Sequence, residues 1–187
     1  MIALLATLTA CEADSVRSYQ SDNYPQRLSD WGLISLQNRQ LKVSPEAQLY
    51  SLNTALFSDY ALKLRTVYLP PGQQAKYRDY ETFEFPAGTI ISKSFVYPID
   101  DQGRLIATQH SNKGAAPFST DTHRLMETRL LVKQHSGWDA LPYIWRGDDA
   151  YLSPTGGLQQ HTLSDGRRLN YLIPSKNQCA TCHATNH

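Results

Sequence analysis

The sequence has little of what defines several common protein classes. It contains three cysteines in 187 residues, and 18 basic residues nearly balance 17 acidic ones. Three thiols do not make a disulfide framework, and a formal net charge of +1 gives no field that would attract nucleic acid. After the first ten residues no segment is long and apolar enough to span a bilayer. The sequence therefore argues against disulfide-rich, nucleic-acid-binding and multi-spanning membrane proteins.

The first residues have the character of a processing segment. Residues 1–10, MIALLATLTA, are apolar and uncharged, and Leu8-Thr9-Ala10-Cys11 resembles the lipobox of bacterial lipoproteins. The resemblance implies cleavage before Cys11, acylation of its thiol and a periplasmic protein anchored to a bacterial membrane by lipid. Residues 11–23 would then be a polar tether. No Lys or Arg precedes the apolar stretch, so an apolar leader followed by a chance cysteine stays open as an alternative.

The rest of the chain, 24–187, is expected to form one domain. A hydrophobic content of 41% suits a single core at this length. Short strands joined by Gly and Asp turns predict an antiparallel sheet. With a few short helices on one face of that sheet, the expected class is α+β.

Two segments before the C-terminus favour helices. Residues 25–32 carry a proline ahead of Leu28 and Trp31 and end at a glycine, which predicts a short helix. Residues 44–57 begin with Ser44 as a candidate N-cap, although an extended segment that turns at the following asparagine is nearly as well supported.

Alternating apolar and polar residues predict the strands. A turn is expected at residues 100–103 and an exposed loop at 107–122. The predicted strands are 62–67, two strands around a Pro-Ala-Gly turn within 83–97, then 124–133, 139–146 and 169–173.

The strongest motif lies in the last nine residues. Residues 179–183 read Cys-Ala-Thr-Cys-His, and the C-x-x-C-H pattern is the attachment site of c-type haem. Thiols three residues apart on a helical turn reach the two vinyl groups of one porphyrin edge. The histidine that follows is placed under the iron as an axial ligand. We therefore expect one covalent haem c held by Cys179 and Cys182, with His183 on the metal and Ser175 capping the helix that presents them.

Other uses of the two thiols are less well supported. A zinc site needs a second pair of ligands, and the sequence has no other cysteine pair. A redox dithiol of the thioredoxin kind sits between a strand and a long helix early in a βαβ unit, whereas this motif follows the predicted strands. Haem is therefore the preferred interpretation.

Longer segments resemble known haem proteins. The motif, residues 86–95 and residues 127–145 together resemble cytochrome P460 and cytochrome c′-β. That resemblance implies a haem lying against an antiparallel sheet, often with an open sixth position on the iron. It also draws attention to Lys93, because cytochrome P460 carries a lysine–porphyrin bond on a matching strand; a surface-facing lysine is the commoner use of such a residue.

A second resemblance is to a group of exported bacterial c-type cytochromes of unknown role. It rests on the segments LFSDYALK, RLMETRLLV and IPSKNQCATCH, which here are residues 56–63, 124–132 and 173–183. Members of that group often continue to a second haem. A truncated di-haem cytochrome is therefore an alternative.

The sequence does not select a sixth iron ligand or the partners of the haem propionates. Met126 is a candidate thioether, but a core position on a strand explains it better. Glu127 and Arg129 share a strand parity, so an ion pair or a solvated face explains them without function. Candidate histidine ligands are His110, His123, His135 and His161, each of which a solvated loop position explains better. His187 would lie on the same helical face as His183 and cannot easily reach the far side of the porphyrin. Candidate partners of the propionates are Arg65, Arg124, Arg129, Arg167 and Arg168. Apolar side chains expected over an open iron face are Phe95, Leu130 and Trp145.

These observations predict an exported monohaem c-type cytochrome that transfers electrons. The alternatives are a P460-like redox enzyme or binder of NO or CO, and a haem-bearing interaction module. The sequence does not identify the redox partner protein, and it leaves a homodimer open.

Overall fold

A computed structural model describes residues 15–54, 56–108 and 118–183, the last four of these through their backbone alone. It contains ten strands, one 3-10 helix and one α-helix within those residues. They are η1 (Leu28–Trp31), β1 (Ile34–Gln37), β2 (Gln40–Val43), β3 (Ala47–Leu49), β4 (Leu62–Tyr68), β5 (Ile90–Pro98), β6 (His123–Gln134), β7 (Gly137–Arg146), β8 (Asp149–Leu152), β9 (Gly157–Thr162), β10 (Arg168–Ile173) and α1 (Lys176–His183).

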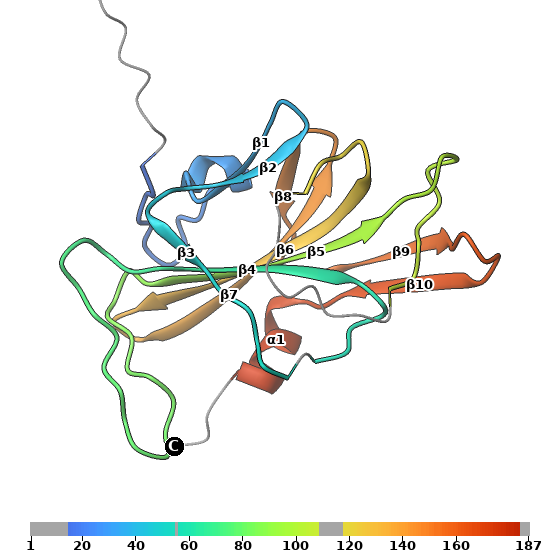
Figure 1. The fold of residues 1–187 in the computed structure, drawn as a ribbon. Helices are drawn as coiled ribbons and strands as arrows, with labels where there is room; N and C mark the ends of the chain where they lie inside the picture. Colours follow the sequence, from blue (N-terminus) through green and yellow to red (C-terminus); the bar gives the residue numbers. More distant parts are fainter. Residues whose placement is uncertain (1–14, 55, 109–117, 184–187) are drawn as a thin grey trace, which may run out of the picture.

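One six-stranded sheet organises the molecule. Its strands follow chain order, β3-β4-β5-β6-β7-β8, and each pairs with its neighbours antiparallel. Two further hairpins, β1–β2 and β9–β10, form separate two-stranded sheets. In Figure 1 the β1–β2 hairpin lies on one side of the central sheet, and α1 lies on the other.

The first face of the central sheet carries the larger apolar cluster. Alternate residues of β4 to β7 pack there against η1 and the β1–β2 hairpin. Trp31 is fully buried, and its indole Nε1 donates a hydrogen bond to the Tyr143 hydroxyl at 2.8 Å. That hydroxyl donates in turn to the backbone oxygen of Pro25 at 2.8 Å. The buried polar groups are thus paired, as a dry core requires.

The opposite face, here called the α1 face, is covered by the β9–β10 hairpin and by α1. It carries a second cluster that includes Phe95, Tyr97, Ile144, Tyr171 and Ile173. The helix packs against β7. Both faces of the sheet are therefore buried over part of their area, and the sheet is the middle of three layers.

Several predicted elements are confirmed. The short helix is η1, and it ends at Gly32, which adopts a left-handed φ of 65°. The strands predicted at 62–67, 124–133, 139–146 and 169–173 are β4, β6, β7 and β10. The turn at 100–103 closes with a hydrogen bond from Gly103 N to Asp100 O at 2.8 Å. The antiparallel sheet and the C-terminal helix are also as expected.

The predicted α+β class is wrong. The chain is built mostly from antiparallel strands, and layers made of strands cover the sheet where helices were expected. The candidate helix at 44–57 is absent from the described part of that range: Ser44 Oγ accepts from Glu46 N at 3.2 Å, which makes a turn, and the short strand β3 follows. The first of the two strands predicted within 83–97 is also absent, and Glu84 forms only an isolated bridge with Lys76.

The N-terminal residues that the structure describes run along the sheet. Val16, Tyr19 and Tyr24 pack against the first cluster. The carboxylate of Asp139 on β7 accepts hydrogen bonds from the Ser21 hydroxyl at 2.8 Å and the Tyr24 hydroxyl at 2.6 Å. The later part of the predicted tether is therefore docked. In the described ranges no helix is long and apolar enough to cross a membrane.

Candidate functional site

The motif lies on α1, which begins directly after Pro174. The Ser175 hydroxyl accepts from Gln178 N at 3.3 Å, and the Gln178 side chain accepts from Ser175 N at 2.9 Å. This reciprocal pair is a capping box, and it satisfies two backbone N–H groups at the helix start. The prediction that Ser175 caps a short helix carrying residues 179–183 is confirmed.

Two contacts and a glycine fix the start of α1 against the sheet. Lys176 N donates to Pro154 O at 2.9 Å, and Lys176 Nζ pairs with Asp139 Oδ1 at 2.8 Å. Gly156 lies against the junction of β10 and α1 with a left-handed φ of +69°, and a Cβ there would come within 2.2 Å of Ile173 O. Only glycine fits a position with both properties.

Cys179 is on the inner side of the helix. Its side chain is 8% exposed, and it is close enough to the Arg129 guanidinium to raise the pKa of that group. The sulfur therefore faces the α1 face of the sheet. Cys182 and His183 belong to the same helix, and their side chains lie outside what the structure describes.

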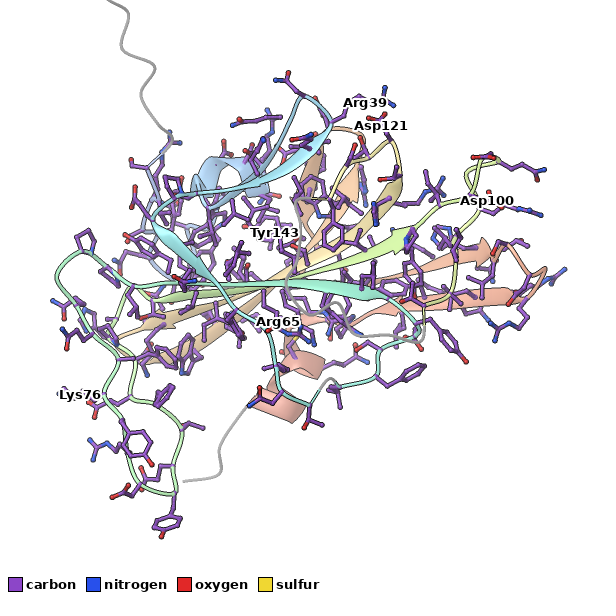
Figure 2. The ribbon with its side chains drawn as sticks, in the orientation of Figure 1. Arg39, Arg65, Lys76, Asp100, Asp121 and Tyr143 are labelled. Atoms are coloured by element: carbon purple, nitrogen blue, oxygen red, sulfur yellow. The ribbon has the colours of Figure 1, made fainter. Side chains whose placement is uncertain are left out.

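A row of cations crosses the sheet on this face. Arg65 on β4 is paired in register with Lys93 on β5, which is paired with Arg129 on β6. Lys63, two residues before Arg65 on β4, lies on the same face of the sheet. Residues directly opposite each other on antiparallel strands have Cβ atoms about 5 Å apart, and like charges in such positions repel. Figure 2 shows Arg65 on the side of the sheet where α1 lies.

One carboxylate lies among these cations. Glu127 is fully buried, accepts two hydrogen bonds from Arg129 at 2.8 and 2.5 Å, and accepts a third from the Tyr171 hydroxyl at 2.8 Å. Of the two explanations that the sequence left open for Glu127 and Arg129, the structure shows the ion pair, and the buried Glu127 is not on a solvated face. No ion pair within the described residues joins Glu127 to Arg65 or Lys93, although the charge of Glu127 acts to raise the pKa of Lys93.

Burial and neighbouring charge shift the protonation of this cluster. The pKa of Lys93 is lowered to about 8, first by burial and then by Arg65, Arg129 and Lys63. Burial also lowers the pKa of Arg65. For Arg129 burial acts in the same direction, but the hydrogen bonds to Glu127 outweigh it and the pKa is raised.

The aromatic ring of Phe95 packs against the charged groups of Lys93 and Arg129. Lys93 Nζ lies 4.9 Å from the centre of the Phe95 ring, and Arg129 Cζ lies 4.4 Å from it. Such cation–π contacts partly replace the water that burial removes. Lys93 is therefore a half-buried residue of the α1 face, unlike the solvated lysine that is commonest on strands.

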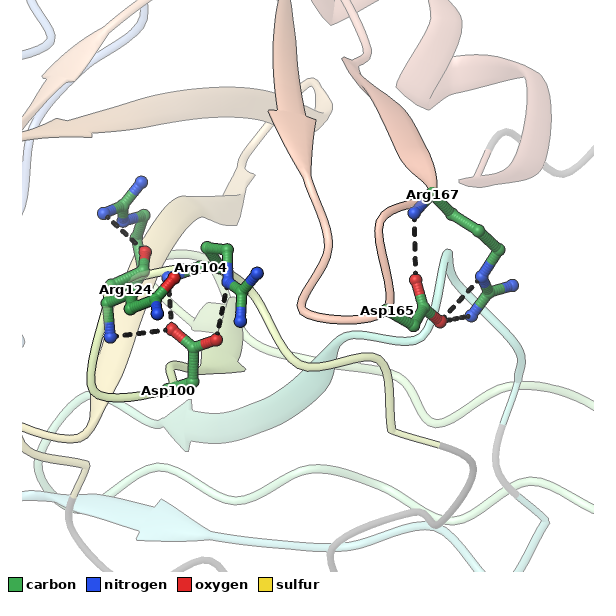
Figure 3. A network of polar contacts seen from close by, with 7 residues as sticks. Asp100, Arg104, Arg124, Asp165 and Arg167 are labelled. Carbon is green, nitrogen blue, oxygen red and sulfur yellow. Dashed lines mark hydrogen bonds and ion pairs between the residues drawn. The ribbon is translucent and has the colours of Figure 1, made fainter.

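The five arginines proposed for the propionates do not gather in one place. Arg65 and Arg129 are on the α1 face near the motif. Arg124 donates to Gly103 O at 3.1 Å, and Arg167 pairs with Asp165 at 2.8 Å, so each serves a turn of its own (Figure 3). Arg168 is exposed on β10.

The candidate sixth ligands are scattered. Met126 is 1% exposed inside the second cluster, as expected of a core residue. His123 and His161 line one pocket together, and burial lowers the pKa of both. His123 is six residues from Arg129 along β6, which is about 20 Å of strand. His135 is exposed after β6. His110 and His187 lie outside the described residues, as does Cys11.

The apolar side chains expected over the haem do not share a face. Phe95 belongs to the second cluster, on the α1 face. Leu130 and Trp145 belong to the first cluster, on the other face. Phe95 alone of the three is therefore on the face that carries α1, because strand parity places Leu130 and Trp145 on the opposite one. Tyr97, Tyr171 and Ile144 accompany Phe95 instead.

Where the structure describes side chains, no three His, Cys, Asp or Glu side chains gather in a way that could hold a metal ion. No protein-family model, curated protein or solved structure matches the chain. The resemblances to cytochrome P460 and to the exported cytochromes stay predictions.

Proposed function

We propose that the chain is an exported monohaem c-type cytochrome that transfers electrons. One observation carries the proposal: the Cys-Ala-Thr-Cys-His sequence occupies a capped helix whose first cysteine is buried against the α1 face of the sheet. In this proposal Cys179 and Cys182 form thioether bonds to the porphyrin, and His183 binds the iron.

The residues around α1 fit such a group. A haem is a large apolar ring with two carboxylates, and it needs both apolar contacts and cations. The α1 face offers an apolar cluster around Phe95 and Tyr171. Next to it are Arg65, Lys93 and Arg129, more positive charge than Glu127 balances. Aromatic side chains there would exclude water from one side of the ring.

When bound, a haem supplies one-electron redox chemistry at its iron. The chain would hold and orient it. Cys179 and Cys182 would hold the porphyrin and His183 would bind its iron, while the Lys176–Asp139 ion pair at 2.8 Å fixes the helix on β7. A rigid attachment of this kind suits electron transfer, because little has to reorganise when the charge changes.

Covalent attachment is the direct test. The full chain would be expressed with a c-type maturation system, and its mass and acid–acetone extract measured. We expect a mass increase of one haem and a pigment that stays with the protein. Cys182→Ala should weaken attachment, and His183→Ala should largely abolish it. Cys11→Ser is the matched control, since it removes a cysteine outside the motif and should leave the haem in place. An unshifted mass, or haem lost to the solvent, contradicts the proposal.

A haem that binds NO or CO at an open iron position is a second candidate function. The observation that favours it is the placement of the described thioether and histidines: Met126 is enclosed in the core, and His123 and His161 line a separate pocket. Addition of CO to the reduced holoprotein distinguishes the two functions. A changed visible spectrum supports an open position, and an unchanged low-spin spectrum supports two protein ligands and a plain electron carrier.

A further inference from the structure

Arg65 and Lys93, two cations of the row on the α1 face, have no anionic partner among the described residues. Arg65 is 7% exposed, and in the part of the chain that the structure describes its Nη2 has no hydrogen-bond partner. No ion pair within the described ranges reaches Arg65 or Lys93. A buried guanidinium nitrogen without an acceptor loses its hydration and gains nothing in return. An acceptor from outside these residues would relieve that cost.

The three positions are also aligned for a common ligand. Register places Arg65, Lys93 and Arg129 side by side on three neighbouring strands. Arg129 binds Glu127 through Nε and Nη2, which leaves its Nη1 for another acceptor. Arg65 Nη2 and the Lys93 ammonium complete a set of donors on one face. Oxygen atoms spaced as in a carboxylate suit donors of this kind.

We propose that Arg65, Lys93 and Arg129 form an anion-binding site on the α1 face that takes a carboxylate or a similar small oxyanion. Neutralising the row removes the repulsion between like charges in register and gives the buried Arg65 nitrogen its acceptor. The Phe95 ring beneath Lys93 and Arg129 keeps the cations in place.

The anion has two sources. It is either a propionate of a haem attached at Cys179, which rests on the proposed function, or a free anion that enters beside α1. Cys179 is close enough to influence Arg129, so a group attached to this sulfur starts near the row. Both sources present the same carboxylate chemistry, and they differ in whether the site is already filled in the holoprotein.

Thermal unfolding of the full chain tests the site. Two forms are compared: the holoprotein, and a haem-free form made by Cys179→Ser with Cys182→Ser. Sodium malonate and inorganic phosphate are added at constant ionic strength, with chloride as reference. We expect a saturable rise in the unfolding midpoint of the haem-free form, by about 5 °C at a hundred-fold excess over the dissociation constant. Arg65→Gln and Lys93→Gln should each abolish the rise. Lys42→Gln, an exposed position on β2, is the matched control and should keep it.

The pattern across the two forms identifies the source. If the haem-free form responds to the anions and the holoprotein does not, propionates fill the site in the holoprotein. If both forms respond to the added anions, the site takes a free anion. No response of the haem-free form to either probe overturns the proposal. If the unmodified chain carries no haem, the proposed function fails, and the same titration still decides the anion site.

A second measurement applies if the haem-free form does not fold. In a holoprotein with propionates at the row, Arg65→Gln and Lys93→Gln each remove a positive charge near the iron and should lower the reduction potential. Lys42→Gln should leave it unchanged. Equal potentials in all four proteins contradict propionate binding at this row.

Discussion

Gly156 shows how much one residue can control the placement of the motif. Both its φ of +69° and the 2.2 Å approach to Ile173 O exclude a side chain. Gly147 has a similar φ of +66°, but a Cβ there meets nothing within 4 Å. Comparing alanine substitutions at Gly156 and Gly147 therefore distinguishes the free-energy cost of a left-handed backbone conformation from the cost of a steric clash with Ile173 O.

We expect Gly156→Ala to destabilise the protein several times more than Gly147→Ala. A side chain in the left-handed region costs about 1 kcal/mol, and this is all that Gly147→Ala incurs. Gly156→Ala must also push the β10–α1 junction away. Chemical denaturation of both variants measures the two free energies. Equal losses of unfolding free energy would mean that the β10–α1 junction can move away from the new Cβ without an energetic cost.

Lys93 makes stability depend on pH in an unusual direction. Its pKa is about 8 in the fold against an ordinary 10.5, because burial and then Arg65, Arg129 and Lys63 disfavour its charge, while Glu127 favours it. Between these values the unfolded chain binds more protons than the native state. The free energy of unfolding therefore rises with pH.

We expect this rise between about pH 8 and pH 9.5 in denaturant titrations. Lys93→Gln should remove it, and Lys42→Gln should not. Tyrosines with raised pKa values, such as Tyr24 at about 12, act in the opposite direction only as the pH approaches 10. A slope that survives Lys93→Gln would show that another group causes it.

At the scale of elements, α1 depends on its cap because it has only eight residues. Short helices are marginal without outside support. Ser175→Ala removes the acceptor for Gln178 N and should cost about 1 kcal/mol. Gln178→Ala should cost a similar amount, and Asn177→Ala, at an exposed position of the same helix, should cost less. Calorimetry of the three variants measures this, and equal losses would contradict the role of the cap.

Long strands with strict alternation could be predicted from the sequence, and short or irregular elements could not. β6 has twelve residues and alternates over most of them, so its type follows from the pattern alone. β1, β2 and β8 have four residues each, too few to show a period. In residues 44–57 a favourable helix start was overridden by a Ser44 turn and by pairing of β3 with β4.

The motif was visible in the sequence, but the cation row was not. Residues 179–183 are contiguous, and their helix follows from a local cap. Arg65, Lys93 and Arg129 are separated by 28 and 36 residues, and only the register of three strands brings them together. Nothing in the sequence distinguished between the five arginines that were candidate partners of the haem propionates. Strand parity could have divided them between faces, but pairing partners could not be deduced.

At the scale of the whole molecule, the lipoprotein prediction concerns residues outside those described. If the lipobox resemblance holds, the mature protein begins at an acylated Cys11 and partitions into detergent. Two or more acyl chains are needed for stable anchoring. Mass spectrometry of the N-terminal peptide from the native host checks this, and Cys11→Ser should release the protein into the aqueous phase. An intact Met1 in a membrane-free extract would contradict it.

Asp139 connects distant parts of the chain to one strand. Its carboxylate accepts from Ser21, 118 positions earlier, and from Tyr24, 115 positions earlier. It also pairs with Lys176, on the helix that follows the last strand. The first and last described segments therefore meet at a single side chain near the start of β7.

This meeting point has a consequence for folding order. Contacts between distant residues give the chain a high contact order, and such folds close late and slowly. The N-terminal segment cannot complete its docking with α1 until the whole domain has left the ribosome. If the chain is exported unfolded and receives a haem at Cys179, as proposed above, the same delay keeps that cysteine accessible before the sheet closes over it. A slow final folding step would then be the interval in which the haem is attached.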